Sequence, residues 1–191
     1  MVVWLYGSLR LPGKETKLDY DDIITFHGHS CPGLAIGFRL ATAAMNALGA
    51  NRSDDEELFA VVESDACGVD ALQCVSGCTF GKGNLVFRDY GKHAYSLFYR
   101  VRQQGVRVVF HGKGIPVELR EDKPVFAKRI MAEQEDAILS VARIPYEDLQ
   151  TARVRKSVIC ASCGESVMDT RVRETGDGYD CIPCAEHSTT C

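Results

Sequence analysis

The chain has 191 residues, of which 46% are apolar and 25% are charged, and its formal net charge at pH 7 is −4. This composition indicates a globular protein with an ordinary core, and the mild negative charge gives no general attraction for nucleic acid or anionic membranes. Because no apolar run approaches the roughly 18 residues that span a bilayer and no export signal is recognisable, we expect no membrane segment and a cytoplasmic location.

The first half of the chain is predicted to alternate between helix and strand. Residues 1–20 are expected to be irregular. A helix is predicted from Pro32 to about Leu48, because apolar side chains recur at helical spacing on two stripes, and Gly49 suits a left-handed helix end. A valine-rich strand at 58–64 and a short helix at 67–76 follow.

The second half is predicted to be rich in strands. Strands are expected at 84–90, 94–100 and 106–110, and a long helix at 123–141. The resulting order is not a strict alternation of strand and helix, so the sequence predicts an α+β fold built on a mostly antiparallel sheet. The basic, polar stretch 151–158 is read as a link between a core domain (1–155) and a small unit (156–191).

Four of the nine cysteines form two CxxC pairs near the C-terminus, Cys160 with Cys163 and Cys181 with Cys184, separated by 17 residues. This is the spacing of a tetrahedral Cys₄ zinc site, which is closed and therefore structural. A segment this short buries too little apolar surface to fold alone, so we expect zinc to stabilise it. The alternatives are His187 as a substitute ligand, an iron–sulfur or redox dithiol site, and unrelated free cysteines.

A second candidate site begins at His27, His29 and Cys31, directly before Pro32. Proline is favoured at the first helical position, which places Cys31 at the N-cap, near unpaired N–H groups that favour thiolate. In an extended segment the two imidazoles and the sulfur would share one side. Such a set can ligate a metal and leave a position for an exogenous ligand; the alternative is a buried histidine beside an inert cysteine.

Residues 63–85 supply further candidates for this core site. On a helix from Cys67, the side chains of Cys67, Cys74 and Cys78 fall on one side with Asp70 nearby, although cysteines are also common core residues. The following loop resembles a phosphate-binding loop only weakly, because its spacing is one residue short and Gly83 follows Lys82. We therefore favour a turn there, with an anion near Lys82 as the alternative.

Two stretches, FHGHSCPGLAIGFR and DACGVDALQCVSGCTFGKGNL, resemble the FmdE family, which takes its name from formylmethanofuran dehydrogenase. The resemblance covers roughly residues 20–140 and implies an α+β core, and over 156–191 the chain is similar to members with a treble-clef zinc finger. The family motif carries over to His27, His29, Cys31, Cys67 and Asp70.

The resemblance implies a core metal of unknown identity held by His27, His29, Cys31 and Cys67, with Cys31, His29, Cys67 and Asp70 as catalytic candidates if the core is an enzyme. It also implies service to one-carbon chemistry, with formylmethanofuran dehydrogenase or a related molybdenum or tungsten enzyme as the partner.

Two other functional classes remain open. In one, the finger and its basic residues dock a protein or, less favoured on an acidic chain, nucleic acid; these residues are Arg153, Arg155, Lys156, Arg171 and Arg173. In the other, Cys31 and Cys67 perform thiol redox or sulfur transfer. A homodimer is compatible with either.

Overall fold

The computed structural model describes residues 18–148, 155–176 and 178–187. The chain divides into two compact units, residues 1–151 and 152–191. The irregular lead-in predicted for residues 1–20 lies almost wholly outside the described residues. Within the described part of the chain, no helix is both long enough and apolar enough to cross a membrane.

A five-stranded sheet in the order β2-β1-β3-β4-β5 forms the centre of the first unit. Its strands are β1 (Leu58–Val62), β2 (Leu85–Phe87), β3 (Ala94–Tyr99), β4 (Gln104–Phe110) and β5 (Leu139–Ile144). Ala60 on β1 pairs in parallel with Leu85 and in antiparallel fashion with Leu97, and every other pairing in this sheet is antiparallel. The predicted α+β class with a mostly antiparallel sheet is confirmed.

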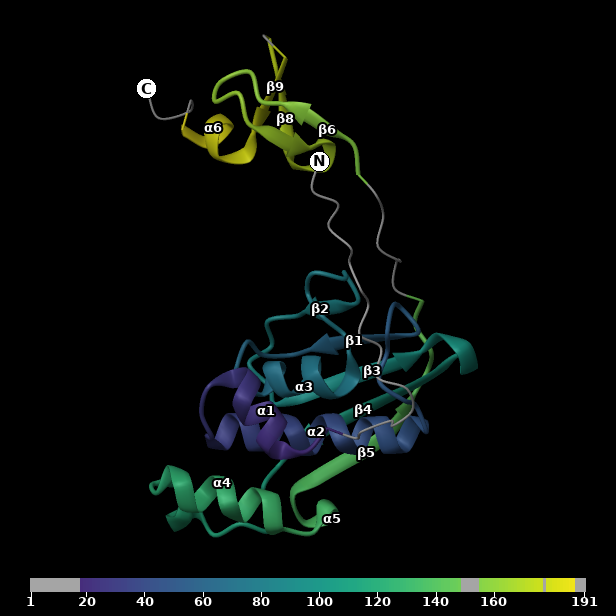
Figure 1. Ribbon diagram of the computed structural model, residues 1–191, viewed down its shortest axis with the longest axis vertical. Helices are drawn as coiled ribbons and strands as arrows, with labels where there is room; N and C mark the ends of the chain where they lie inside the picture. Colours follow the sequence, from purple (N-terminus) through teal and green to yellow (C-terminus); the bar gives the residue numbers. More distant parts are fainter. Residues whose placement is uncertain (1–17, 149–154, 177, 188–191) are drawn as a thin grey trace, which may run out of the picture. The chain divides into compact units, whose positions relative to one another are not determined.

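The helices of this unit gather around one long central helix. They are α1 (Tyr20–His27), α2 (Pro32–Leu48), α3 (Gly68–Ser76), α4 (Lys123–Ala132) and α5 (Glu135–Ile138), with 3₁₀ turns η1 (Arg100–Arg102) and η2 (Val117–Arg120). Helix α2 packs against the sheet and against α3 and α4 (Figure 1). Its apolar stripes, including Leu40 and Leu48, are buried and form the core with the inner face of the sheet.

The predicted bounds of α2 are those observed, because both ends carry strong local signals. Cys31 is the N-cap, its sulfur accepts a hydrogen bond from the Leu34 N–H, and Pro32 follows at the first helical position. Gly49 ends the helix at φ 56°, a left-handed conformation that favours glycine.

The predicted helix at 123–141 is wrong in its second half. Helix α4 ends at Ala132, Glu133 is extended at ψ 153°, and the chain makes only the short α5 before entering β5. Strand β5 pairs along the whole of β4, from Gly105 opposite Ile144 to Phe110 opposite Leu139. The long-range ladder therefore outweighs the helical preference of this segment. The strands predicted at 58–64 and 84–90 are also shorter than expected.

Helices α2 and α3 touch through glycines. A Cβ atom built on Gly37 would lie 2.2 Å from both the Cα and the carbonyl oxygen of Gly68, which is closer than any real side chain tolerates. A Cβ on Gly68 would in turn lie 2.6 Å from the Tyr95 hydroxyl. The absence of side chains at these two positions lets the starts of α2 and α3 come together.

The second unit contains two small antiparallel hairpins and a helix. The hairpins are β6 (Ser157–Ile159) with β7 (Ser166–Met168), and β8 (Val172–Thr175) with β9 (Gly178–Cys181). The 3₁₀ turn η3 (Asp169–Arg171) links the hairpins, and α6 (Ile182–His187) follows the second hairpin.

Candidate metal centres

Three potential ligands from three helix ends meet in the first unit. Ligand atoms of His27, Cys31 and Cys67 all lie within 4.8 Å of one another. His27 is the last residue of α1, Cys31 is the N-cap of α2, and Cys67 is the N-cap of α3. The sequence-based candidates His27, Cys31 and Cys67 are thus brought together by the packing of these helices.

The backbone at His27 differs from the extended chain that we expected. Asp19 and Asp22 form a reciprocal capping box that starts α1, and Gly28 ends the helix at φ 97°. His27 therefore reaches the group from a helix C-terminus, and the left-handed turn at Gly28 leads the chain back toward Cys31.

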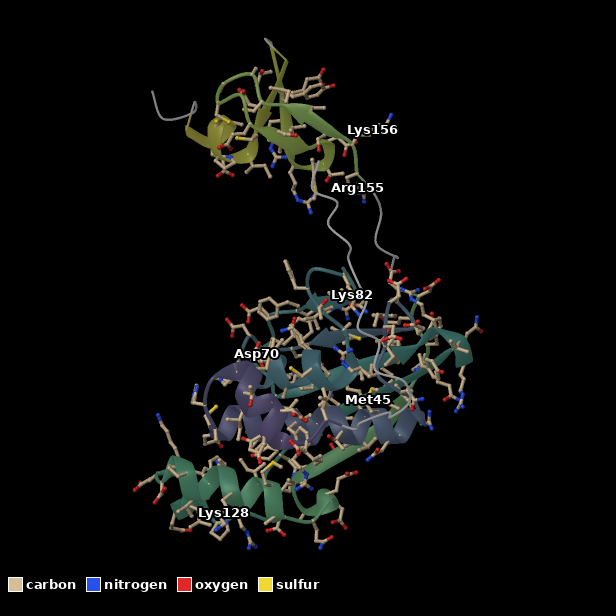
Figure 2. All side chains as sticks on the ribbon, viewed as in Figure 1. Met45, Asp70, Lys82, Lys128, Arg155 and Lys156 are labelled. Atoms are coloured by element: carbon tan, nitrogen blue, oxygen red, sulfur yellow. The ribbon has the colours of Figure 1, made fainter. Side chains whose placement is uncertain are left out.

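The imidazole of His27 is held by a carboxylate on α3. Its Nδ1 lies 2.7 Å from Oδ2 of Asp70, which is labelled in Figure 2. Because an ionised carboxylate only accepts hydrogen bonds, Nδ1 is the donor, and in the neutral imidazole Nε2 then carries the lone pair. Nε2 is buried and has no hydrogen-bond partner in the described residues. A carboxylate–histidine pair with a free second nitrogen is the arrangement that orients histidine toward a metal.

The two sulfurs differ in their surroundings. Cys31 is half-buried, and its sulfur accepts the Leu34 N–H at 3.3 Å, whereas Cys67 is exposed and makes no capping hydrogen bond. Desolvation, together with the neighbouring Cys31 thiol, raises the pKa of Cys67. A bound metal reverses this preference, because a coordinating thiol is deprotonated. One nitrogen and two sulfurs form a set that suits zinc with a fourth position open.

Other candidates lie around this group but outside it. The ring of His29 lies 4.7 Å from that of His27, centroid to centroid, yet His29 is exposed and contributes no atom to the three-ligand group. Asp70 is hydrogen-bonded to His27 but is not itself a member of the three-ligand group. Cys74 is half-buried and Cys78 is fully buried, where desolvation raises its pKa to about 11. Of the three cysteines expected on one helical face, only Cys67 joins the group.

Lys82 has a structural role in its loop. Its ammonium donates to the carbonyl oxygens of Ser53, Asp54 and Asp55 at 3.4, 3.2 and 3.3 Å. These contacts support the turn interpretation, and Figure 2 shows Lys82 well away from Asp70.

A cleft of about 450 Å³ opens beside the three-ligand group, and sequence reasoning missed it. His27, Cys67 and Asp70 form one wall of this cleft. The remaining lining comes from β1, α3, β2 and the segments that connect them, and no local sequence pattern predicts that these elements meet.

The second unit holds the four-cysteine group. The sulfurs of Cys160, Cys163, Cys181 and Cys184 lie within 4.8 Å of one another. Backbone N–H groups of Cys163 and Cys181 lower the pKa of Cys160 to about 7, which favours the thiolate needed for metal binding. The buried Asp180 accepts hydrogen bonds from the Ser162 N–H and hydroxyl, which fixes the first CxxC turn against β9.

Together these features define a mixed α+β protein with two cysteine-containing groups that could hold metal ions. The chain belongs to the FmdE family, since residues 26–156 match the family model described as "FmdE, Molybdenum formylmethanofuran dehydrogenase operon". The family resemblance of the two quoted motifs is therefore confirmed.

Two relatives illustrate the family. The crystal structure of an FmdE-like protein from Syntrophus aciditrophicus, described as related to a tungsten formylmethanofuran dehydrogenase, matches with a TM-score of 0.68 and 26% identity, covering 92% of this chain and 96% of that chain. A protein of Archaeoglobus fulgidus named "Probable S-adenosyl-L-methionine-binding protein" is 32% identical over 188 residues, covering 84% of this chain and 50% of that protein. The chain thus spans about half the length of this curated relative.

Proposed function

We propose that this protein is a metal-binding member of the FmdE family whose core centre holds one ion through His27, Cys31 and Cys67. The observation that carries this proposal is the buried, unpartnered Nε2 of His27, held by Asp70 on its other nitrogen beside two free thiols. A buried nitrogen without a partner is costly, and a metal ion would satisfy it.

The proposed centre is an open one. Three protein ligands leave a coordination position for an exogenous ligand, which the adjoining cleft can supply. When bound there, the metal would provide Lewis-acid chemistry. In this proposal His29, whose ring lies beside that of His27, is next to the open coordination position. Asp70 orients His27.

For the second unit we propose a structural zinc ion on Cys160, Cys163, Cys181 and Cys184. Four thiolates complete a tetrahedron and leave no open position. The order of a CxxC turn between β6 and β7, a β8–β9 hairpin and a helix that begins at the second CxxC agrees with a treble-clef finger.

The family association suggests the setting of the core centre. We propose that it serves one-carbon chemistry in the cytoplasm, beside formylmethanofuran dehydrogenase or a related molybdenum or tungsten enzyme. The support for this is the operon named in the family description. The S-adenosylmethionine binding named for the Archaeoglobus relative belongs to a protein of which this chain covers 50%.

The experiment that tests the proposed centres is a count of metal ions per chain by mass spectrometry of the metals. We expect two ions in the wild-type protein and one in a Cys31→Ser/Cys67→Ser double variant. Serine is a good N-cap, so the fold of the double variant should persist. Cys74→Ser is the matched control, because Cys74 lies on α3 outside the three-ligand group. A count that is equal in the wild type and the double variant would refute the core centre.

A further inference from the structure

The cleft beside the core centre has apolar walls that end in exposed aromatic rings. Among the lining residues, Val62 and Leu85 are buried and Val69 is half-buried. Phe80 and Phe87 also line it, with 79% and 47% of their surface exposed. Large aromatic side chains left this open stabilise a protein little, but they offer flat faces on which another ring can stack.

A buried hydroxyl in the same cleft lacks a partner. Ser64 follows β1, is 9% exposed, and its Oγ is buried without a hydrogen-bond partner among the described residues. Because buried hydroxyl groups are almost always paired, this one is available to a polar atom of a ligand in the cleft. The cleft therefore combines apolar walls with a few polar groups, and Ser64 is one that can fix the orientation of an occupant.

The charges around the cleft restrict its occupant further. The charged side chains that line it are Asp65 and Asp70, and no lysine or arginine is among the lining residues. Of the basic residues near the lining in sequence, Arg88 lies 3.7 Å from a carboxylate oxygen of Glu147, and Lys82 donates to three carbonyl groups. Phosphates and other anions are therefore disfavoured, and a neutral or weakly basic ligand suits the two carboxylates better.

From these three observations we infer that the cleft binds a planar aromatic or heteroaromatic ligand that is neutral or weakly basic. The ligand stacks on Phe80 and Phe87, hydrogen-bonds to Ser64, and presents a donor atom to the open position of the core metal. This inference rests on the proposed core centre for the last contact, whereas the ring and hydroxyl contacts depend only on the cleft.

Imidazole and benzimidazole are suitable probes, because they carry the same nitrogen donor and differ by one fused ring. We expect the full-length, metal-loaded protein to bind benzimidazole about tenfold more tightly than imidazole in calorimetric titrations, a difference of about 1.4 kcal/mol. An offset-stacked aromatic contact and buried ring surface together supply an effect of this size.

Three variants separate the contacts. Phe87→Ala should remove most of the preference for benzimidazole, and Ser64→Ala should weaken benzimidazole binding at least threefold. Tyr90→Ala is the control, since Tyr90 is an aromatic residue with 59% exposure that does not line the cleft, and it should leave the preference intact. Equal affinities for the two probes in the wild type, or a loss that is as large in Tyr90→Ala, would overturn the inference.

A second measurement keeps this test separate from the metal count. Benzimidazole should shift the methyl NMR signals of Val62, Val69 and Leu85 in the wild type. At higher probe concentration it should also shift them in the Cys31→Ser/Cys67→Ser variant, which lacks the core metal. If these shifts occur while the metal counts are equal, the cleft inference stands and the proposed core centre fails. If the signals shift in neither protein, the inference fails whatever the metal count.

Discussion

Replacing Asp70 by asparagine tests the core centre at the contact that orients its histidine. Asp70 Oδ2 accepts the Nδ1 proton of His27 at 2.7 Å, and Oδ1 accepts from the Gln73 side-chain amide at 3.3 Å. Asparagine keeps the shape of the side chain but removes the charge and one acceptor. If its oxygen faces His27, its NH₂ group faces the Gln73 NH₂ group. Gln73 must then turn its amide over, which breaks the bond from the Phe80 N–H to Gln73 Oε1.

The size of the effect follows from the position of the carboxylate behind the ligand. Losing a hydrogen-bonding carboxylate behind a metal-ligating histidine typically lowers metal affinity 10- to 100-fold. This corresponds to about 1.4–2.7 kcal/mol of binding free energy. Asp70 is partly exposed, so solvent screening places our expectation in the lower half of this range, at about 10- to 30-fold.

The assay is competition for one metal between the protein and a chromophoric chelator, with the four-cysteine site already filled. Asp65→Asn is the matched control. Asp65 is an exposed carboxylate that lines the same cleft, but the hydrogen bond with His27 is made by Asp70. The reasoning is refuted if Asp70→Asn binds the core metal as tightly as the wild type, or if Asp65→Asn weakens it equally.

Three further results are expected. Gly37→Ala would place a methyl group 2.2 Å from Gly68, so urea denaturation should show a loss of about 1–3 kcal/mol in the free energy of unfolding. The control Gly81→Ala should lose little stability, because Gly81 faces open space. Equal losses in the two variants would contradict the prediction. Chelation or Cys181→Ser should unfold the finger and leave the core folded in calorimetry, because metal binding supplies the finger's folding free energy; a single cooperative transition would show that our boundary near residue 155 is wrong. Burial raises the pKa of the Cys78 thiol from 9.0 to about 11, so as the pH rises the unfolded chain loses this proton before the folded chain does. Between pH 9 and pH 11 the free energy of unfolding should therefore fall by about 1.4 kcal/mol per pH unit. In denaturant titrations at several pH values, Cys78→Ala should reduce this dependence of the unfolding free energy on pH. An unchanged dependence in the variant would contradict the assignment to Cys78.

The parts of the fold that could be predicted are those with local causes. The N-cap at Cys31, the proline after it and the glycine at 49 bracket α2 within a single stretch of sequence. The helix predicted at 123–141 was wrong in its second half because residues 139–144 pair with β4, about thirty residues earlier. Pairing between segments so far apart produces no local sequence pattern.

The candidate site was predictable in its residue types but not in its arrangement. Histidine and cysteine near Pro32, and cysteine at 67, already indicated a ligand set. That Asp70 supports His27, and that His29 lies beside the group, depends on the capping box that makes α1 a helix. Its signal, aspartates at positions 19 and 22 three residues apart, was available in the sequence. Ser64 had no such signal, because its hydroxyl becomes buried, without a partner among the described residues, only when the chain folds.

The contact between Gly37 and Gly68 makes the spacing of two sulfurs a property of the main chain. Cys31 and Cys67 begin the two helices that meet there, so their separation is set by how closely the helix backbones approach. As long as Gly37 and Gly68 are kept, surface mutations can accumulate without altering the distance between the two sulfurs. Widening this helix pair would therefore move the two sulfurs apart without any change to the cysteines themselves.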